Sequence, residues 1–164
     1  CEVIQCERKE GNPMTDFMEK FRLSGKTAWI TGASYGIGFA IAKAFHAAGA
    51  RIVFNDINQE LVDRGLNAYR EEGIPAQGFV CDVTDEQQVT DLVRHIESDI
   101  APIDILVNNA GIIRRVPMIE MSVEEFRKVV DVDLNAPFIC AKAVLPGMIA
   151  RGHGKIINIC SMMS

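Results

Sequence analysis

Short apolar runs rich in β-branched residues alternate with longer amphipathic segments from Lys26 onward. Runs of this kind, bounded by glycine, proline or polar residues, are typical of buried strands. The sequence predicts five strands, at residues 27–30, 51–55, 77–81, 103–107 and 155–160. Between them, apolar residues recur at the spacing that one face of a helix requires, so four helices are expected.

Local signals mark where these helices begin and end. Gly49 ends the first helix, because glycine readily takes the left-handed conformation that follows many helices. Asn58 is the expected N-cap of the second, since its side chain can accept a bond from a free N–H group. The other two helices open with capping boxes, formed by Thr84 with Gln87 and by Ser122 with Glu125.

This alternation predicts an α/β fold with a doubly wound parallel sheet of the Rossmann type, truncated after the fifth strand. The strands are apolar on both faces, as a sheet covered by helices on both sides requires. We expect residues 14–164 to form one dinucleotide-binding domain whose C-terminal part is missing.

Residues 1–13 precede the first methionine, Met14. Codons for the Lys-Glu-Gly run at 9–11 would be rich in purines and would lie where a bacterial ribosome-binding site is expected. We therefore interpret 1–13 as a non-native leader; the alternative is a disordered extension of the native protein.

Composition narrows the class of protein. The 164 residues carry 17 Lys and Arg against 22 Asp and Glu, a formal charge of −5, which disfavours non-specific nucleic-acid binding. Uninterrupted apolar stretches are far shorter than the roughly 20 residues that span a bilayer, so no membrane segment is predicted. The five cysteines are scattered without a CxxC pair, which favours free thiols in a reducing cytoplasm over disulfides or a metal site.

A glycine-rich turn, TGASYGIG, follows the first predicted strand and opens the first helix. In such a turn Gly32 permits a tight bend, Gly36 lets the backbone approach a pyrophosphate, and Gly38 lets the helix pack closely on the strand. The helix N-terminus then offers free N–H groups to the phosphates. The predicted phosphate-binding residues are Gly32, Ser34, Tyr35, Gly36, Ile37 and Gly38.

Asp56 lies at the end of the second predicted strand. A carboxylate there can accept hydrogen bonds from the adenosine ribose and would repel a 2′-phosphate. The glycine-rich turn contains no Arg or Lys that would bind such a phosphate. The cofactor is expected to be NAD or NADP, and Asp56 favours NAD. The alternative is that Asp56 only opens the following turn and does not contact the cofactor.

Four motifs in order, TGASYGIG, CDV, NNAG and IINICS, resemble the short-chain dehydrogenase/reductase family. The segments FNDINQEL, NNAGIIRRVPMIEM, DLNAPF and INICSMMS are similar to the gluconate 5-dehydrogenase group of that family. The resemblance implies that Asp82 binds the adenine amino group and that Val83 contacts the adenine through its backbone. It also implies that the turn after the fourth strand lines the cofactor ribose, through Asn109, Ala110 and Gly111.

The resemblance further implies that Ser161 is the catalytic serine, which would bind and polarise the substrate oxygen; Ser164 is the competing candidate. Asp133 stands where the family has an asparagine that holds a water in a proton relay. A carboxylate performs that role here, or Asp133 is an ordinary residue of a helix face. The family's Tyr-x-x-x-Lys would lie beyond Ser164, so the 164 residues alone are expected to be inactive.

The resemblance thus implies that the full-length protein is a cytoplasmic homotetramer that interconverts gluconate and 5-ketogluconate by hydride transfer. Alternatives are a 3-oxoacyl-carrier-protein reductase, a hydroxysteroid dehydrogenase or, for the 164 residues alone, a non-catalytic nucleotide-binding module. Arg114 and Arg115 follow the NNAG turn and could hold the carboxylate of a sugar acid, because a guanidinium binds carboxylates with two parallel hydrogen bonds. Arg114 is nearer the turn and is the first candidate, while a solvated pair of surface charges is the alternative.

Overall fold

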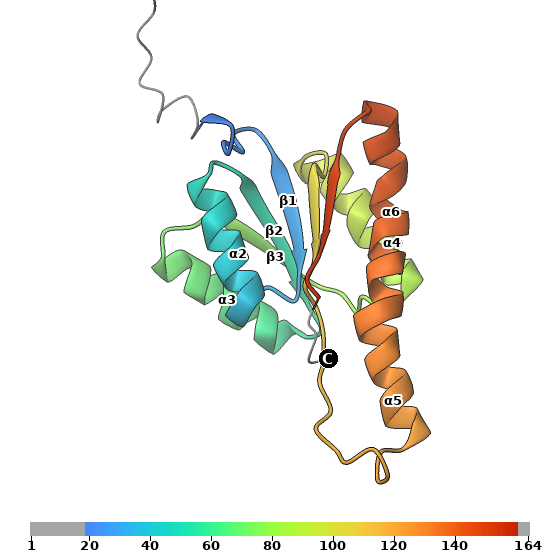
Figure 1. Ribbon diagram of the computed structural model, residues 1–164. Helices are drawn as coiled ribbons and strands as arrows, with labels where there is room; N and C mark the ends of the chain where they lie inside the picture. Colours follow the sequence, from blue (N-terminus) through green and yellow to red (C-terminus); the bar gives the residue numbers. More distant parts are fainter. Residues whose placement is uncertain (1–18, 161–164) are drawn as a thin grey trace, which may run out of the picture.

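A computed structural model describes residues 19–160, and its centre is a sheet of five parallel strands in the order β3-β2-β1-β4-β5 (Figure 1). The predicted doubly wound, Rossmann-type fold is confirmed. The predicted leader 1–13 lies outside the described residues. The strands are β1 Thr27–Thr31, β2 Arg51–Asp56, β3 Ala76–Val80, β4 Ile105–Asn108 and β5 Lys155–Asn158.

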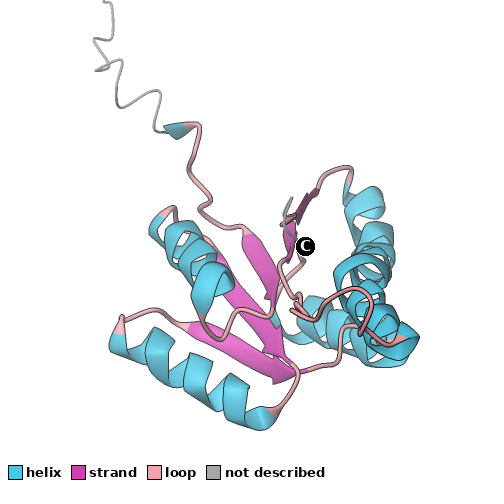
Figure 2. Cartoon of the chain, turned by 60° about the horizontal axis from the view of Figure 1, so that its bottom comes forward, coloured by secondary structure: helices cyan, strands magenta, loops and turns pink. Residues whose placement is uncertain are grey.

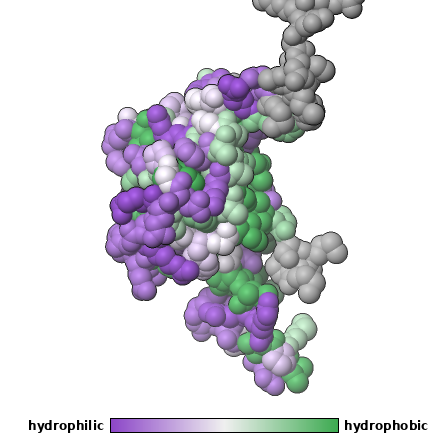
Figure 3. All heavy atoms as spheres, turned by 90° about the vertical axis from the view of Figure 1, so that its left-hand side faces the viewer, coloured by the Kyte–Doolittle hydropathy of each residue, from purple (hydrophilic) through white to green (hydrophobic). Residues whose placement is uncertain are grey.

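Helices cover both faces of the sheet, so the molecule has three layers (Figures 1 and 2). One face carries α2 and α3, and the surface on that side is mostly hydrophilic (Figure 3). The other face carries α4 and the long helical run that ends in α6 (Figure 1). The helices are α2 Gly36–Ala47, α3 Gln59–Glu71, α4 Glu86–His95 with a π-helical turn Ile96–Ile100, α5 Val123–Val130, a second π-helical turn Asp131–Asn135, and α6 Ala136–Arg151.

The register of the strands builds one apolar row on each face of the sheet. In one row Ile30 pairs with Phe54 on β2 and with Val107 on β4, and all three are buried against α2 and α3. In the neighbouring row Trp29 pairs with Val53 and Leu106, which are buried against α4 and α6. Because successive side chains of a strand point to opposite faces, five apolar residues in a row can serve two cores.

One predicted helix start is wrong. The N-cap of α4 is Asp85, whose carboxylate accepts hydrogen bonds from the N–H groups of Gln87 and Gln88. The Thr84 hydroxyl instead donates to the Asp82 carboxylate at 2.7 Å. A carboxylate carries a full charge toward the helix dipole, which a hydroxyl does not. The other predicted capping box, at Ser122, and the Asn58 cap are confirmed.

The helical run Val123–Arg151 bears on the prediction that no segment spans a membrane. Among the described residues it is long and apolar enough to cross a bilayer by length and composition alone, a test that core helices of soluble proteins also pass. One side of α6 packs into the core through Cys140, Val144 and Met148, while Phe138 and Ile149 are exposed. The prediction about membranes therefore stays a prediction.

A chain of buried hydrogen bonds joins β1, β2 and the residue that follows β3. The indole N–H of Trp29 donates to the side-chain oxygen of Asn55 at 3.0 Å, and the Asn55 amide donates to the carbonyl of Cys81 at 3.0 Å. Both Trp29 and Asn55 are almost completely buried. A buried polar group without a partner is costly, so Asn55 satisfies two groups that water cannot reach.

We expect Asn55→Ala to lower the free energy of unfolding of the full-length protein by roughly 2 kcal/mol or more, because it leaves a buried donor and a buried acceptor unpaired. Urea unfolding followed by Trp29 fluorescence measures this. Asn67→Ala is the control, since Asn67 is an exposed residue of α3 that accepts from Arg70. Equal losses in the two variants would contradict the role given to Asn55.

Candidate functional site

The glycine-rich turn bends sharply between β1 and α2. Gly32 and Gly36 have φ angles of 62° and 65°, in the left-handed region that other residues rarely adopt. Tyr35 is the N-cap residue of α2, and its side chain makes no capping hydrogen bond. This leaves the first N–H groups of α2 available to an anion at the carboxyl end of the sheet.

Hydrogen bonds from the turn after β4 hold the glycine-rich turn in place. The Asn109 amide donates to the carbonyls of Thr31 and Gly32, at 2.9 and 3.0 Å. The Thr31 hydroxyl accepts from the N–H groups of Asn109 and Ala110, each at 3.0 Å. A Cβ at Gly38 would lie 2.5 Å from the Asn109 amide nitrogen, so this position has room only for glycine.

A pocket of about 360 Å³ lies at the carboxyl ends of β1 to β4. This is the edge where parallel α/β sheets bind ligands, and β1 and β4 are the strands between which the strand order reverses. Of the predicted cofactor-binding residues, only Ser34 and Gly38 do not line the pocket. Those that line it are Gly32, Tyr35, Gly36, Ile37, Asp56, Asp82, Val83, Asn109, Ala110 and Gly111.

The pocket contains an unsatisfied carboxylate oxygen. One oxygen of Asp56 accepts the N–H of Ile57 at 2.9 Å, while the other is buried without a partner in the described structure. The hydroxyl of Ser34, beneath the glycine-rich turn, is likewise buried and unpartnered. Buried polar atoms are nearly always hydrogen-bonded, so the orphaned oxygen of Asp56 fits a ligand that brings hydroxyl donors, such as a ribose.

Asp82 and Val83 lie beyond the end of β3 rather than within it. One carboxylate oxygen of Asp82 accepts the N–H and hydroxyl of Thr84, at 2.9 and 2.7 Å. This fixes the backbone at the rim of the pocket, where Val83 is buried. The predicted contacts of the two residues with adenine are compatible with this arrangement and stay predictions.

Asp133 lies on the π-helical turn between α5 and α6 and points toward the turn after β4. Its carboxylate accepts the N–H of Ile112 at 2.9 Å, and a Cβ at Gly111 would lie 3.4 Å from the same oxygen. The side chain therefore holds the chain that leaves the pocket, in addition to any relay role. Ser161 and Ser164 lie outside the described residues.

Arg114 and Arg115 are exposed on the loop between β4 and α5 and do not line the pocket. Hydrogen bonds from the hydroxyl and N–H of Ser122 hold the pKa of Glu125 below its usual range, and the positive charge of Arg114 adds to this effect. Arg114 thus lies near the start of α5. The predicted role of both arginines in binding a substrate carboxylate stays a prediction.

A thiol group also lines the pocket, at Cys81. Burial, with the nearby charges of Asp82 and Asp85, raises the pKa of Cys81 to about 12, so this pocket-lining thiol stays protonated and is a poor nucleophile. Within residues 19–160, no group of three or more His, Cys, Asp or Glu side chains is arranged to hold a metal ion.

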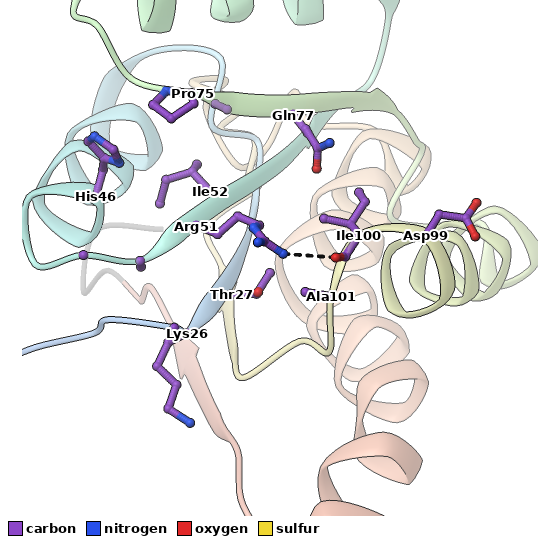
Figure 4. Close-up of a pocket in the computed structure, with 14 residues that line it drawn as sticks. Lys26, Thr27, His46, Arg51, Ile52, Pro75, Gln77, Asp99, Ile100 and Ala101 are labelled. Carbon is purple, nitrogen blue, oxygen red and sulfur yellow. Dashed lines mark hydrogen bonds between the residues drawn. The ribbon is translucent and has the colours of Figure 1, made fainter.

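A larger cavity, of about 620 Å³, lies at the opposite, amino end of the sheet (Figure 4). Lys26, Arg51 and Gln77 are among its lining residues, and Arg51 donates to the carbonyl of Ile100 at 3.0 Å. None of the predicted site residues lines it. The motifs therefore gather at the smaller pocket.

The sequence did not reveal every residue at the pocket. Ile57, Leu61, Ile112 and Val132 give it apolar walls, although they look like ordinary apolar residues in the sequence. Arg64 of α3 lies with its guanidinium carbon 5.0 Å from the centre of the Tyr35 ring. Arg64 and Tyr35 are distant in the sequence, so their contact is visible only in the folded structure.

A family model for short chain dehydrogenases matches residues 26–164. The chain belongs to the short-chain dehydrogenase family. The predicted similarity to gluconate 5-dehydrogenases is confirmed by relatives that carry this name.

Three similar proteins illustrate how the chain relates to known dehydrogenases. A 2-dehydro-3-deoxy-D-gluconate 5-dehydrogenase of Formosa agariphila is 47% identical over 148 residues, which are 90% of this chain and 56% of that protein. The crystal structure of 2-keto-3-deoxy-D-gluconate dehydrogenase from Streptococcus agalactiae is 66% identical with a TM-score of 0.81, covering 92% of this chain and 57% of that one. A Burkholderia cenocepacia gluconate 5-dehydrogenase, in complex with NADP and tartrate, is 44% identical with a TM-score of 0.81 and coverages of 88% and 57%. The chain thus spans little more than half the length of these relatives.

We expect Asp56→Ala to narrow the preference for NAD over NADP in the full-length protein by roughly tenfold, because it removes both a ribose acceptor and a charge that repels the 2′-phosphate. The ratio of kcat/KM values for the two cofactors measures this. Asp63→Ala is the matched control, since Asp63 is an exposed acid of α3 outside the pocket. An unchanged ratio would show that Asp56 serves only the turn after β2.

Proposed function

We propose that the full-length protein is an NAD(P)-dependent oxidoreductase that interconverts gluconate and 5-ketogluconate. The observation that carries the proposal is the orphaned carboxylate oxygen of Asp56 in a pocket built by the glycine-rich turn and the turn after β4. Family membership and the NADP held by the Burkholderia relative support the same cofactor class.

The chain's own residues would bind and orient the dinucleotide. The free N–H groups at the start of α2 would receive the pyrophosphate, Asp56 the adenosine ribose, and Asp82 with Val83 the adenine. Asn109, Ala110 and Gly111 would line the ribose next to the nicotinamide. Hydride exchange with the substrate carbon is the chemistry that the nicotinamide supplies when bound.

Two residues would act on the substrate side. Ser161 would hold the substrate oxygen by its hydroxyl and polarise the bond that is oxidised or reduced. Asp133 would keep the turn after β4 in place through its bond to Ile112 and would contribute a carboxylate to proton transfer. We also propose that the protein is a cytoplasmic homotetramer; exposed apolar residues along α5 and α6, such as Phe126 and Phe138, support an assembly.

A second candidate substrate is 2-keto-3-deoxygluconate. It is favoured by the Streptococcus agalactiae dehydrogenase named for this acid, which is 66% identical to the chain. Both candidates are sugar acids, so they share a carboxylate and differ in the groups next to it.

Initial rates of NADH and NADPH formation by the full-length protein decide between these substrates. We expect turnover of at least one of the two acids and none of a hydroxysteroid or a 3-hydroxyacyl thioester. Ser161→Ala is the control and should abolish the turnover, because it removes the group that polarises the substrate oxygen. Turnover of the steroid or thioester alone would overturn the proposed substrate class.

We expect Arg114→Met or Arg115→Met to raise the KM for the acid by roughly tenfold or more, since hydrogen bonds between charged groups contribute about 1.5–3 kcal/mol. Binding of NAD should change little, because neither arginine lines the cofactor pocket. Arg127→Met, an exposed arginine of α5, is the control for loss of charge. If both variants keep the KM within about twofold, the carboxylate is bound elsewhere.

A further inference from the structure

Arg64 is an exposed residue of α3 whose charge is not neutralised by a neighbour. It forms no ion pair or side-chain hydrogen bond within residues 19–160. Glu60, one turn earlier on the same face, is exposed and makes no ion pair with it. The Arg64 side chain makes a cation–π contact with Tyr35, with 5.0 Å between the guanidinium carbon and the centre of the ring. An arginine that stacks on an aromatic ring keeps its N–H groups free at the edge of the guanidinium plane.

The packing of α3 against the glycine-rich turn places Arg64 there. A Cβ at Gly65 would lie 2.9 Å from the Cα of Ser34, so the missing side chain lets the helix approach the turn closely. Tyr69 strengthens this contact, because its hydroxyl donates to the carbonyl of Ala33 at 2.8 Å. Arg64 is therefore held beside the turn by two neighbours on its own helix.

Tyr35 connects this cation to the pocket. The Tyr35 side chain lines the pocket together with Asp56, and about half of its surface is exposed. The guanidinium of Arg64 therefore lies over a residue that lines the same pocket as the ribose acceptor Asp56. This combination suits a ribose that carries a phosphate, because Arg binds phosphate oxygens through a planar pair of donors.

We infer that Arg64, stacked on Tyr35, binds the adenosine 2′-phosphate of NADP and allows a pocket that contains Asp56 to accept NADP as well as NAD. This inference rests on the proposed function. It assigns to a residue of α3 the basic group that the glycine-rich turn itself lacks. Arg64 determines cofactor specificity and takes no part in hydride or proton transfer.

Equilibrium binding of NADPH and NADH to the full-length protein tests the inference by calorimetry, without turnover. We expect Arg64→Met to raise the Kd for NADPH at least tenfold, which corresponds to about 1.4 kcal/mol, and to change the Kd for NADH less than twofold. Arg70→Met is the matched control, because Arg70 is an exposed arginine of the same helix that donates to Asn67 and does not line the pocket. It should leave both constants within twofold.

Each outcome has a distinct meaning. Equal weakening of NADPH and NADH by Arg64→Met would overturn the inference, because the arginine would then only support the turn through Tyr35. Unchanged binding of both would also overturn it and would leave the proposed oxidoreductase intact. If the unsubstituted protein bound neither dinucleotide, the proposed function itself would fall, and the inference with it.

Discussion

The site depends on the hydrogen-bonded junction between Thr31 and Asn109, where β1 and β4 separate. Four bonds join the two segments: the hydroxyl and carbonyl of Thr31 and the carbonyl of Gly32 accept from the backbone and side chain of Asn109 and from the backbone of Ala110. Strands that diverge leave backbone groups unpaired at the very point where the ligand pocket forms. The junction satisfies those groups without filling the pocket, and Gly38 provides the space that the Asn109 amide occupies.

Local patterns were sufficient to predict the sheet and most of its helices, because β2, apart from Arg51, is buried along its whole length, as a strand covered on both faces requires. The sequence patterns failed where two neighbouring side chains could both cap the same helix. At the start of α4, both Thr84 and Asp85 can cap, and only the bond from Thr84 to Asp82 shows why Asp85 does so. They also failed for Arg64, because its significance arises from the close packing of α3 at Gly65, which involves residues distant in sequence.

Asp56 lines the pocket, and Arg64 lies over Tyr35, which also lines it. Asp56 has a buried oxygen without a partner in the described part of the chain, which suits a ribose with free hydroxyls. Arg64 has no ion pair within residues 19–160, and in the proposed role its guanidinium binds a ribose phosphate. The two groups differ in burial, since Asp56 is buried while Arg64 is exposed on α3. An exposed charge is screened by salt far more than a buried one, so the two groups respond differently to ionic strength.

The π-helical turn Asp131–Asn135 couples the cofactor pocket to the loop that carries the candidate substrate arginines. Asp133 on this turn accepts from Ile112, which lies between Gly111 in the pocket wall and Arg114 on the loop. An extra residue in a helical turn shifts the direction of the side chains that follow it, and such turns recur at functional sites. Here the shift lets one carboxylate reach the turn after β4, while α6 keeps Cys140 and Val144 in the core. A hydrogen bond thus connects the start of the loop to the helical run that also completes the hydrophobic core beneath the sheet.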